Sequence, residues 1–233
     1  MARLARLSLP GLVHHVVHLG REQVPIFRDE IDAQRFLALL AENSAIHNIA
    51  VHAFVLLPGR FHLLVTPFVA GNLSKFMQGL SRRYAHAFNN RHHVKGALWD
   101  GRFRSGVLQV DAYLWSTMAY LDWQPVFEQL VDRPADYPWS SHAHYRGSAR
   151  ISWIRPHEAW WSLGNTPFAR EDAYGDLVQG GVDPKLCDLI RTSALHGWSL
   201  GSDAFLSNLT EKTPRPLQPR RPGRPARSPV SSV

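Results

Sequence analysis

Apolar residues in the first half of the chain alternate with polar ones in some segments and recur at helical spacing in others. Segments rich in β-branched residues and bounded by Gly or Pro-Gly are typical of strands, whereas apolar positions three and four residues apart indicate helices. On this basis we expect a strand over residues 11–20, a helix over 29–47, and antiparallel strands over 50–57 and 61–66. Alternation along the last strand places Arg60 and His62 on one face and Phe61 on the other.

A strongly amphipathic helix is predicted next. Asn72 is suited to its N-cap, and apolar residues recur at helical spacing as far as Phe88. Arg82 and Arg83 project from the opposite face of this helix, and further basic residues follow in the next loop. One side of the helix is therefore expected to pack on a core and the other to be basic.

Residues 103–110 predict a fourth strand, and Asp111 is expected to cap a helix that Pro125 ends. The resulting order is strand, helix, strand, strand, helix, strand, helix. This order matches the split βαβ arrangement of ferredoxin-like α+β folds, in which helices pack on one face of an antiparallel sheet.

The remainder of the chain carries weaker signals. Short helices are predicted over residues 184–192 and 202–209, and these would form a small helical C-terminal subdomain. From residue 211 on, proline and arginine dominate and aromatic residues are lacking, which predicts a disordered basic tail. The expected division is a main domain over residues 1–148, the helical subdomain over 149–210 and the tail over 211–233.

Composition narrows the class of protein. The chain has 233 residues, 45% of them apolar, which suffices for one ordinary folded domain with an appendage. Its longest uninterrupted apolar run, residues 53–57, is far shorter than the roughly 20 residues that cross a membrane, so no membrane partner is expected. Cys187 is the only cysteine, which excludes an internal disulfide and a multi-cysteine zinc site and favours a reducing, cytoplasmic setting.

The net charge of +7 is concentrated in two segments. Residues 75–104 carry seven basic residues and one acidic residue, and residues 211–233 carry six and one. Two basic segments on an otherwise mildly acidic chain favour a polyanionic partner, of which nucleic acid is the commonest. A solvated helix face together with a solubilising tail would give the same distribution of charge.

Four segments follow one another along the chain: residues 24–30 (VPIFRDE), 54–67 (FVLLPGRFHLLVTP), 98–105 (LWDGRFRS) and 136–141 (DYPWSS). Together, and in this order, they resemble single-tyrosine HUH transposases of the REP-associated kind. The resemblance extends from about Val13 to Tyr145, well over half of the chain.

The resemblance implies a set of site residues. In that family the second central strand carries two metal-ligating histidines, and the helix after the last strand carries the nucleophilic tyrosine with an amide ligand one turn later. The matching positions here are Tyr120 as nucleophile and His62 and Gln124 as ligands of Mg²⁺ or Mn²⁺. Arg60, however, occupies the first histidine position. Because a protonated guanidinium has no free lone pair and repels a cation, the metal site lacks one ligand.

Two features could compensate for the missing ligand. Another histidine, His14, His18 or His52, could lie close enough to replace it. Alternatively, Arg60 itself could bind the phosphate in place of the metal.

The resemblance also implies a mechanism. Single-stranded or hairpin DNA enters a basic groove, and the Tyr120 hydroxyl attacks a phosphate to give a 5′-phosphotyrosine and a free 3′-hydroxyl, which a second strand can then rejoin. We expect Arg60 to weaken this activity. The residues expected to bind DNA are Arg60, Arg82, Arg83, Arg91, Lys95, Arg102 and Arg104 and, in a Gly-Arg-Pro segment similar to an AT-hook core, Arg221 and Arg224.

Two other functions fit the same residues. The protein could be a catalytically dead DNA-hairpin-binding protein derived from such a transposase. It could also be an RNA-binding module, because aromatic and basic residues on a sheet of this topology suit single-stranded RNA as well. The sequence leaves open whether the protein is a monomer or a homodimer.

Overall fold

The structure is a computed structural model that describes residues 7–219. Its elements in chain order are β1 (His14–Leu19), η1 (Arg21–Gln23), α1 (Glu30–Ile46), β2 (Ile49–Leu57), β3 (Arg60–Pro67), α2 (Asn72–His92), β4 (Arg104–Val107), α3 (Val110–Phe127), η2 (Pro134–Asp136), α4 (His142–Tyr145), η3 (Glu158–Leu163), α5 (Pro167–Gln179), α6 (Pro184–His196) and α7 (Asp203–Thr210).

The four strands form one sheet in the order β2-β3-β1-β4, and each neighbouring pair is antiparallel. Helix α1 connects β1 to β2, and α2 connects β3 to β4. The α+β class and the ferredoxin-like order of elements are therefore confirmed. Strand β4 is shorter than the predicted 103–110, because only four of those residues pair with β1.

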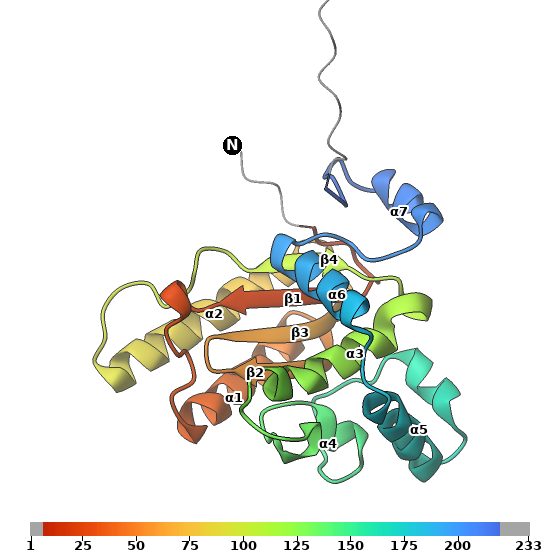
Figure 1. The fold of residues 1–233 in the computed structure, drawn as a ribbon. Coiled ribbons are helices and arrows are strands. Elements are labelled where there is room, and N and C mark those ends of the chain that lie inside the picture. Colours follow the sequence, from red (N-terminus) through yellow and green to blue (C-terminus); the bar gives the residue numbers. More distant parts are fainter. Residues whose placement is uncertain (1–6, 220–233) are drawn as a thin grey trace, which may run out of the picture.

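Helices cover both faces of the sheet, with α3 and α6 crossing in front of the strands in Figure 1. On one face, Phe36 of α1 packs against Phe61 with ring centroids 4.7 Å apart. On the other, Tyr120 of α3 lies over His62 at 6.3 Å. The prediction that helices pack on one face therefore holds for α1 and α2, whereas α3 and α6 cover the opposite face. All nine residues of β2 are buried, and a strand buried along its whole length needs cover on both faces.

Helix α3 continues beyond the residue that was expected to end it. It begins at Val110, before Asp111, and Pro125 lies inside it. Proline inside a helix costs about 3 kcal/mol because it cannot donate to the preceding turn. Burial of the surrounding positions, Gln124 and Pro125 among them, offsets this cost. Gln124 therefore remains on the same helix face as Tyr120, one turn further on.

A buried carboxylate joins α3 to the helices that follow it. Asp122 is 1% exposed, and its Oδ2 accepts hydrogen bonds from His142 Nδ1 at 2.7 Å and from the Tyr174 hydroxyl at 2.6 Å. These partners belong to α4 and α5. A buried charge must be paired or hydrogen-bonded, so this cluster fixes how the three helices pack together.

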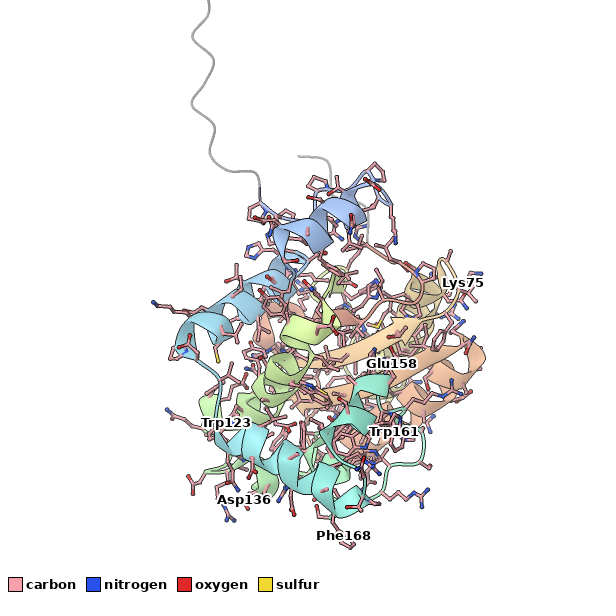
Figure 2. All side chains as sticks on the ribbon, turned by 90° about the vertical axis from the view of Figure 1, so that its right-hand side faces the viewer. Lys75, Trp123, Asp136, Glu158, Trp161 and Phe168 are labelled. Carbon is pink, nitrogen blue, oxygen red and sulfur yellow. The ribbon has the colours of Figure 1, made fainter. Side chains whose placement is uncertain are left out.

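The C-terminal helices share the core of the sheet. Trp160 of η3, Tyr174 of α5 and Ile190 of α6 belong to the same buried cluster as the strands. Helices α6 and α7 correspond to the two helices predicted from the sequence, whereas α5 was not predicted. The outer side of α5 faces solvent, and Phe168 near its start is exposed (Figure 2).

Residues 211–219, which were expected to be disordered, pack against the domain. Leu217 is 6% exposed and joins Leu7, Val107 and Leu206 in a second, small hydrophobic cluster. Its carbonyl accepts a hydrogen bond from the Ser199 amide at 2.9 Å. The packed Leu217 side chain and the Arg215 guanidinium, which donates to Gly197 O at 2.5 Å, together hold this segment in place.

Both edges of the sheet are covered by other parts of the chain. Along β2, the Leu56 amide donates to Trp139 O and the Ser141 amide donates to Phe54 O, both at 2.9 Å. Beside β4, the Leu200 amide donates to Val107 O at 2.8 Å. Several outward-facing backbone groups of each edge strand thus already have partners within the chain. Among the helices of residues 7–219, none is both long enough and apolar enough to cross a membrane.

Candidate functional site

One cleft brings together most of the residues assigned to the site. In the β1–β3 register, Val17 lies opposite His62 and Leu19 lies opposite Arg60, so both β3 side chains point to the face covered by α3 and α6. The cleft between these elements has a volume of about 670 Å³. Its polar and charged lining residues are Arg60, His62, Arg104, Tyr120, Glu128 and Arg191.

The guanidinium of Arg60 is held by three neighbours. Its Nε donates to His62 Nε2 at 3.1 Å, and its Nη2 donates to Gln124 Oε1 at 2.8 Å. The same Nη2 lies 2.5 Å from Glu128 Oε1, at the end of α3. Glu128 was not singled out in the sequence because α3 was expected to end before it. Its position one turn after Gln124 is the signal that would have revealed it.

His62 is buried and belongs to a chain of histidines. Its Nδ1 lies 3.0 Å from His15 Nε2, and both rings are nearly inaccessible to solvent. Burial lowers the pKa of His15 to about 3 and that of His62 well below its ordinary value, with the charge of Arg60 acting in the same direction on His62. Both rings are therefore neutral, and the hydrogen bonds fix their tautomers. Because His62 Nε2 accepts from Arg60, His62 carries its proton on Nδ1 and donates to His15.

None of the three histidines proposed as replacement ligands lies at this site. His14 bonds to Leu12 O, His18 stacks on Trp99 at 4.3 Å, and His52 bonds to Thr66 and Arg155. The strand register explains why: His14 and His18 point to the opposite face of β1 from His15.

Tyr120 faces the cleft from α3 and is only 3% exposed. Burial raises the pKa of its hydroxyl to about 12, while the charge of Arg60 and the hydrogen bond with Gln124 act in the opposite direction. Its ring also contacts His15, with centroids 6.5 Å apart. At neutral pH the hydroxyl is therefore protonated, and the nearest positive charges lower the energy of its ionised form.

The donor atoms present do not fit a divalent cation. His62 Nε2 and Gln124 Oε1, the two remaining ligand atoms, both accept hydrogen bonds from Arg60. A metal ion would have to displace this guanidinium, whose positive charge repels it. Within residues 7–219 no group of three or more His, Cys, Asp and Glu side chains could hold a metal ion. The site thus presents a guanidinium where the sequence resemblance implies a metal.

Comparison with protein families identifies the chain. The family model for IS200-like transposases matches residues 8–124, half of the protein, and this stretch includes both Arg60 and Tyr120. The chain belongs to the IS200-like transposase family. A search of curated proteins found no match.

A solved structure shares the fold of this IS200-like family member. A REP-associated tyrosine transposase bound to a REP hairpin superposes with a TM-score of 0.54 and 15% identity, covering 68% of this chain and 93% of its own. A protein from Deinococcus radiodurans R1 assigned as a transposase gives a lower TM-score of 0.38 and 17% identity, covering 55% of this chain and 97% of its own.

The basic residues of this family member fall into two groups. Arg83 forms an ion pair with Glu42 at 2.7 Å, and Arg91 is held by Asp29 and Asp32, both at 2.6 Å. These acidic partners belong to the start and middle of the α1 region, which the charge count along the sequence did not place beside α2. The positive charge of Arg83 and Arg91 is therefore partly neutralised within the protein.

The remaining predicted DNA-binding residues differ in position. Arg104 lines the cleft with Tyr120, whereas Arg82 and Arg102 line a separate pocket of about 440 Å³ beside the stacked His18 and Trp99 rings. Lys95 is exposed in the loop after α2. Arg221 and Arg224 lie outside the described residues.

Proposed function

We propose that this transposase-family protein binds single-stranded or hairpin DNA in the Arg60–Tyr120 cleft and cleaves it through Tyr120. The observation that carries the proposal is the meeting of Tyr120, Arg60 and His62 in one cleft, with Gln124 bonded to Arg60. A nucleophile on α3 and a guanidinium that can bind a phosphate are thereby close together.

The chemistry assigned to Tyr120 is a transesterification. Its Oη attacks the phosphorus atom of a DNA phosphodiester, an O–P bond to tyrosine forms, and the P–O3′ bond breaks. The phenol proton is released and the 3′ oxygen takes up a proton. The products are a 5′-phosphotyrosine and a free 3′-hydroxyl, and reversal with another 3′-hydroxyl rejoins the DNA.

Two features of the cleft support an attenuated rate. The high pKa of Tyr120 leaves its hydroxyl protonated at neutral pH, so the reactive phenolate is scarce. The side chain is also almost fully buried, so only its edge at the cleft can meet a phosphate. Slow cleavage is therefore the expected behaviour.

DNA binding without cleavage is a second candidate, and one observation favours it. Arg60 occupies both of the remaining candidate ligand atoms, so cleavage that required a metal ion would be lost while the cleft remained basic. Under this candidate the fold and the arginines would recognise a hairpin, and Tyr120 would be a buried structural residue.

The test is covalent capture of DNA. Full-length protein is incubated with labelled single-stranded hairpin DNA from its own genomic flanks, in magnesium, and separated on a denaturing gel. We expect a protein–DNA adduct that Tyr120→Phe abolishes. Tyr113→Phe is the matched control, because Tyr113 lies two turns earlier on the same helix and is half-buried.

The outcomes separate the candidates. An adduct that survives Tyr120→Phe would contradict the assignment of the nucleophile. Tight hairpin binding with no adduct would support the binding-only candidate, and stronger competition by a matched RNA hairpin than by DNA would favour RNA as the ligand.

A further inference from the structure

Arg60 has hydrogen-bonding capacity that the protein itself does not use. A guanidinium has five N–H groups, and Arg60 donates from Nε to His62 and from Nη2 to Gln124, while Nη2 also forms an ion pair with Glu128. Within residues 7–219 no hydrogen bond to Nη1 is found, and the side chain is 28% exposed at the cleft. Two N–H donors of a fixed cation are therefore available to a ligand.

The anchors of Arg60 come from regular elements. His62 is on β3 and is itself held by His15 of β1, while Gln124 and Glu128 lie one turn apart at the end of α3. A side chain held from both the sheet and the helix loses little further freedom when it binds a ligand. Donors fixed in this way are suited to stabilising charge that develops during a reaction.

We propose that Arg60 is a built-in replacement for the divalent cation of this site. Its Nη1 binds a non-bridging oxygen of the DNA phosphate beside Tyr120, so that the protein binds and cleaves DNA without a metal ion. The cleavage step rests on the proposed function, whereas the binding step can be tested independently of it.

The charges around the cleft agree with an anionic ligand. Glu128 is the carboxylate that lines the cleft, and it contacts Nη2 rather than Nη1. Arg104 and Arg191 line the same cleft, and their carboxylate partners, Asp100 at 4.0 Å and Asp188 at 2.8 Å, are not among its lining residues. Glu128 therefore positions Arg60, and the other two arginines, partly neutralised by these partners, add positive charge where the phosphate enters.

The step that Arg60 assists needs no further reactant. The O–P bond to Tyr120 forms as the P–O3′ bond breaks, and a proton is lost from the phenol and gained by the 3′ oxygen. A phosphodiester is exchanged for another phosphodiester, so the net charge does not change. Arg60 contributes by charge-assisted hydrogen bonds to the phosphate oxygens, whose negative charge increases in the transition state.

The first experiment measures metal binding. Full-length protein is titrated into Mn²⁺, and free Mn²⁺ is followed by electron paramagnetic resonance. We expect no stoichiometric binding by the natural protein and binding of one Mn²⁺ by Arg60→His, which keeps His62 and Gln124 beside a neutral imidazole. Stoichiometric binding by the natural protein that His62→Gln removes would overturn the proposal.

The second experiment measures DNA affinity in excess EDTA by fluorescence anisotropy, with Tyr120→Phe as the background so that no adduct forms. Arg60→Gln should weaken hairpin binding at least about tenfold, the effect expected for loss of a charge-assisted hydrogen bond. Arg133→Gln is the control, because Arg133 is exposed and bonds to Asp136 away from the cleft. Equal affinities for Arg60→Gln and the background would overturn the proposal. A thermal melt of each variant verifies that it is folded.

The third experiment measures adduct formation with and without EDTA. The natural protein should form the adduct equally in both conditions, whereas Arg60→His should form it only with added Mn²⁺. Loss of the natural protein's adduct in EDTA would overturn metal-free cleavage. If no adduct forms under any condition, the proposed cleavage fails, and the role of Arg60 in phosphate binding is still decided by the first two experiments.

Discussion

Buried neutral histidines should make this protein markedly less stable in mild acid. His14 donates from Nδ1 to Leu12 O at 2.7 Å and accepts from the Leu9 amide at 3.1 Å. His52 bonds to Arg155 O at 2.7 Å and to the Thr66 hydroxyl at 2.8 Å. In each ring Nδ1 donates to a carbonyl, so a second proton must go to Nε2 and bury a positive charge. On His14 this proton would also break the hydrogen bond from the Leu9 amide, whereas the Thr66 hydroxyl can rotate to accept from His52.

The direction and the size of this loss of stability follow from the pKa values of the two histidines. Burial lowers the pKa of both His14 and His52 to about 4, whereas an unfolded histidine titrates near 6.5. Between about pH 4 and 6.5 the unfolded chain binds more protons than the folded chain. The stabilisation is therefore complete above pH 6.5 and is lost as the pH falls toward 4. At pH 5 each histidine lowers the free energy of unfolding by about 2 kcal/mol, or about 4 kcal/mol for the two.

Urea unfolding followed by tryptophan fluorescence at pH 7.5, 6.5, 5.5 and 5.0 measures this loss. The substitution His52→Gln lowers the free energy of unfolding at every pH. It also removes one titrating group, so the decrease in this free energy between pH 7.5 and pH 5 should be about 2 kcal/mol smaller than in the natural protein. His86→Gln is the control, because His86 is exposed on α2. The same pH dependence in His52→Gln and the natural protein would refute the argument.

Two further predictions concern the C-terminal part of the chain. Tyr174→Phe removes one of two donors to the buried Asp122 and should lower the free energy of unfolding by about 1.5–3 kcal/mol in urea at pH 7.5; an unchanged value would show that this hydrogen bond contributes nothing. Deleting residues 220–233, which hold four arginines, should leave the melting temperature unchanged because the packed Leu217 remains. The same deletion should reduce the salt dependence of DNA binding by about 0.7 for each phosphate that these arginines neutralise, and an equal salt dependence would show that the segment does not bind phosphates.

Local spacing in the sequence was sufficient to predict part of the fold and of the site. Alternation along β3 placed Arg60 and His62 on one face, and helical spacing placed Gln124 one turn after Tyr120. These relations depend only on the geometry of a single strand or helix, so they hold wherever the element packs. The order of the first elements was correct for the same reason.

Relations between elements could not be predicted in this way. His15 is the partner of His62 because of the register between β1 and β3, which no residue of β1 specifies alone. Glu128 was missed because packing carries α3 through Pro125 against the local preference. The continuous apolar run of β2 was the one signal that could have predicted cover on both faces, since such runs are typical of strands buried on both sides.

The covered edges of the sheet also bear on assembly and on solubility. An exposed edge strand is a ready template for pairing with another chain, in a dimer or in an aggregate. Here the Trp139–Ser141 segment caps β2 and Leu200 caps β4, so neither edge can accept a strand from a second molecule without first losing its own cover. Association of copies of this protein by strand addition would therefore first require release of a capping segment, and that release is the event that would open a route to β-aggregation.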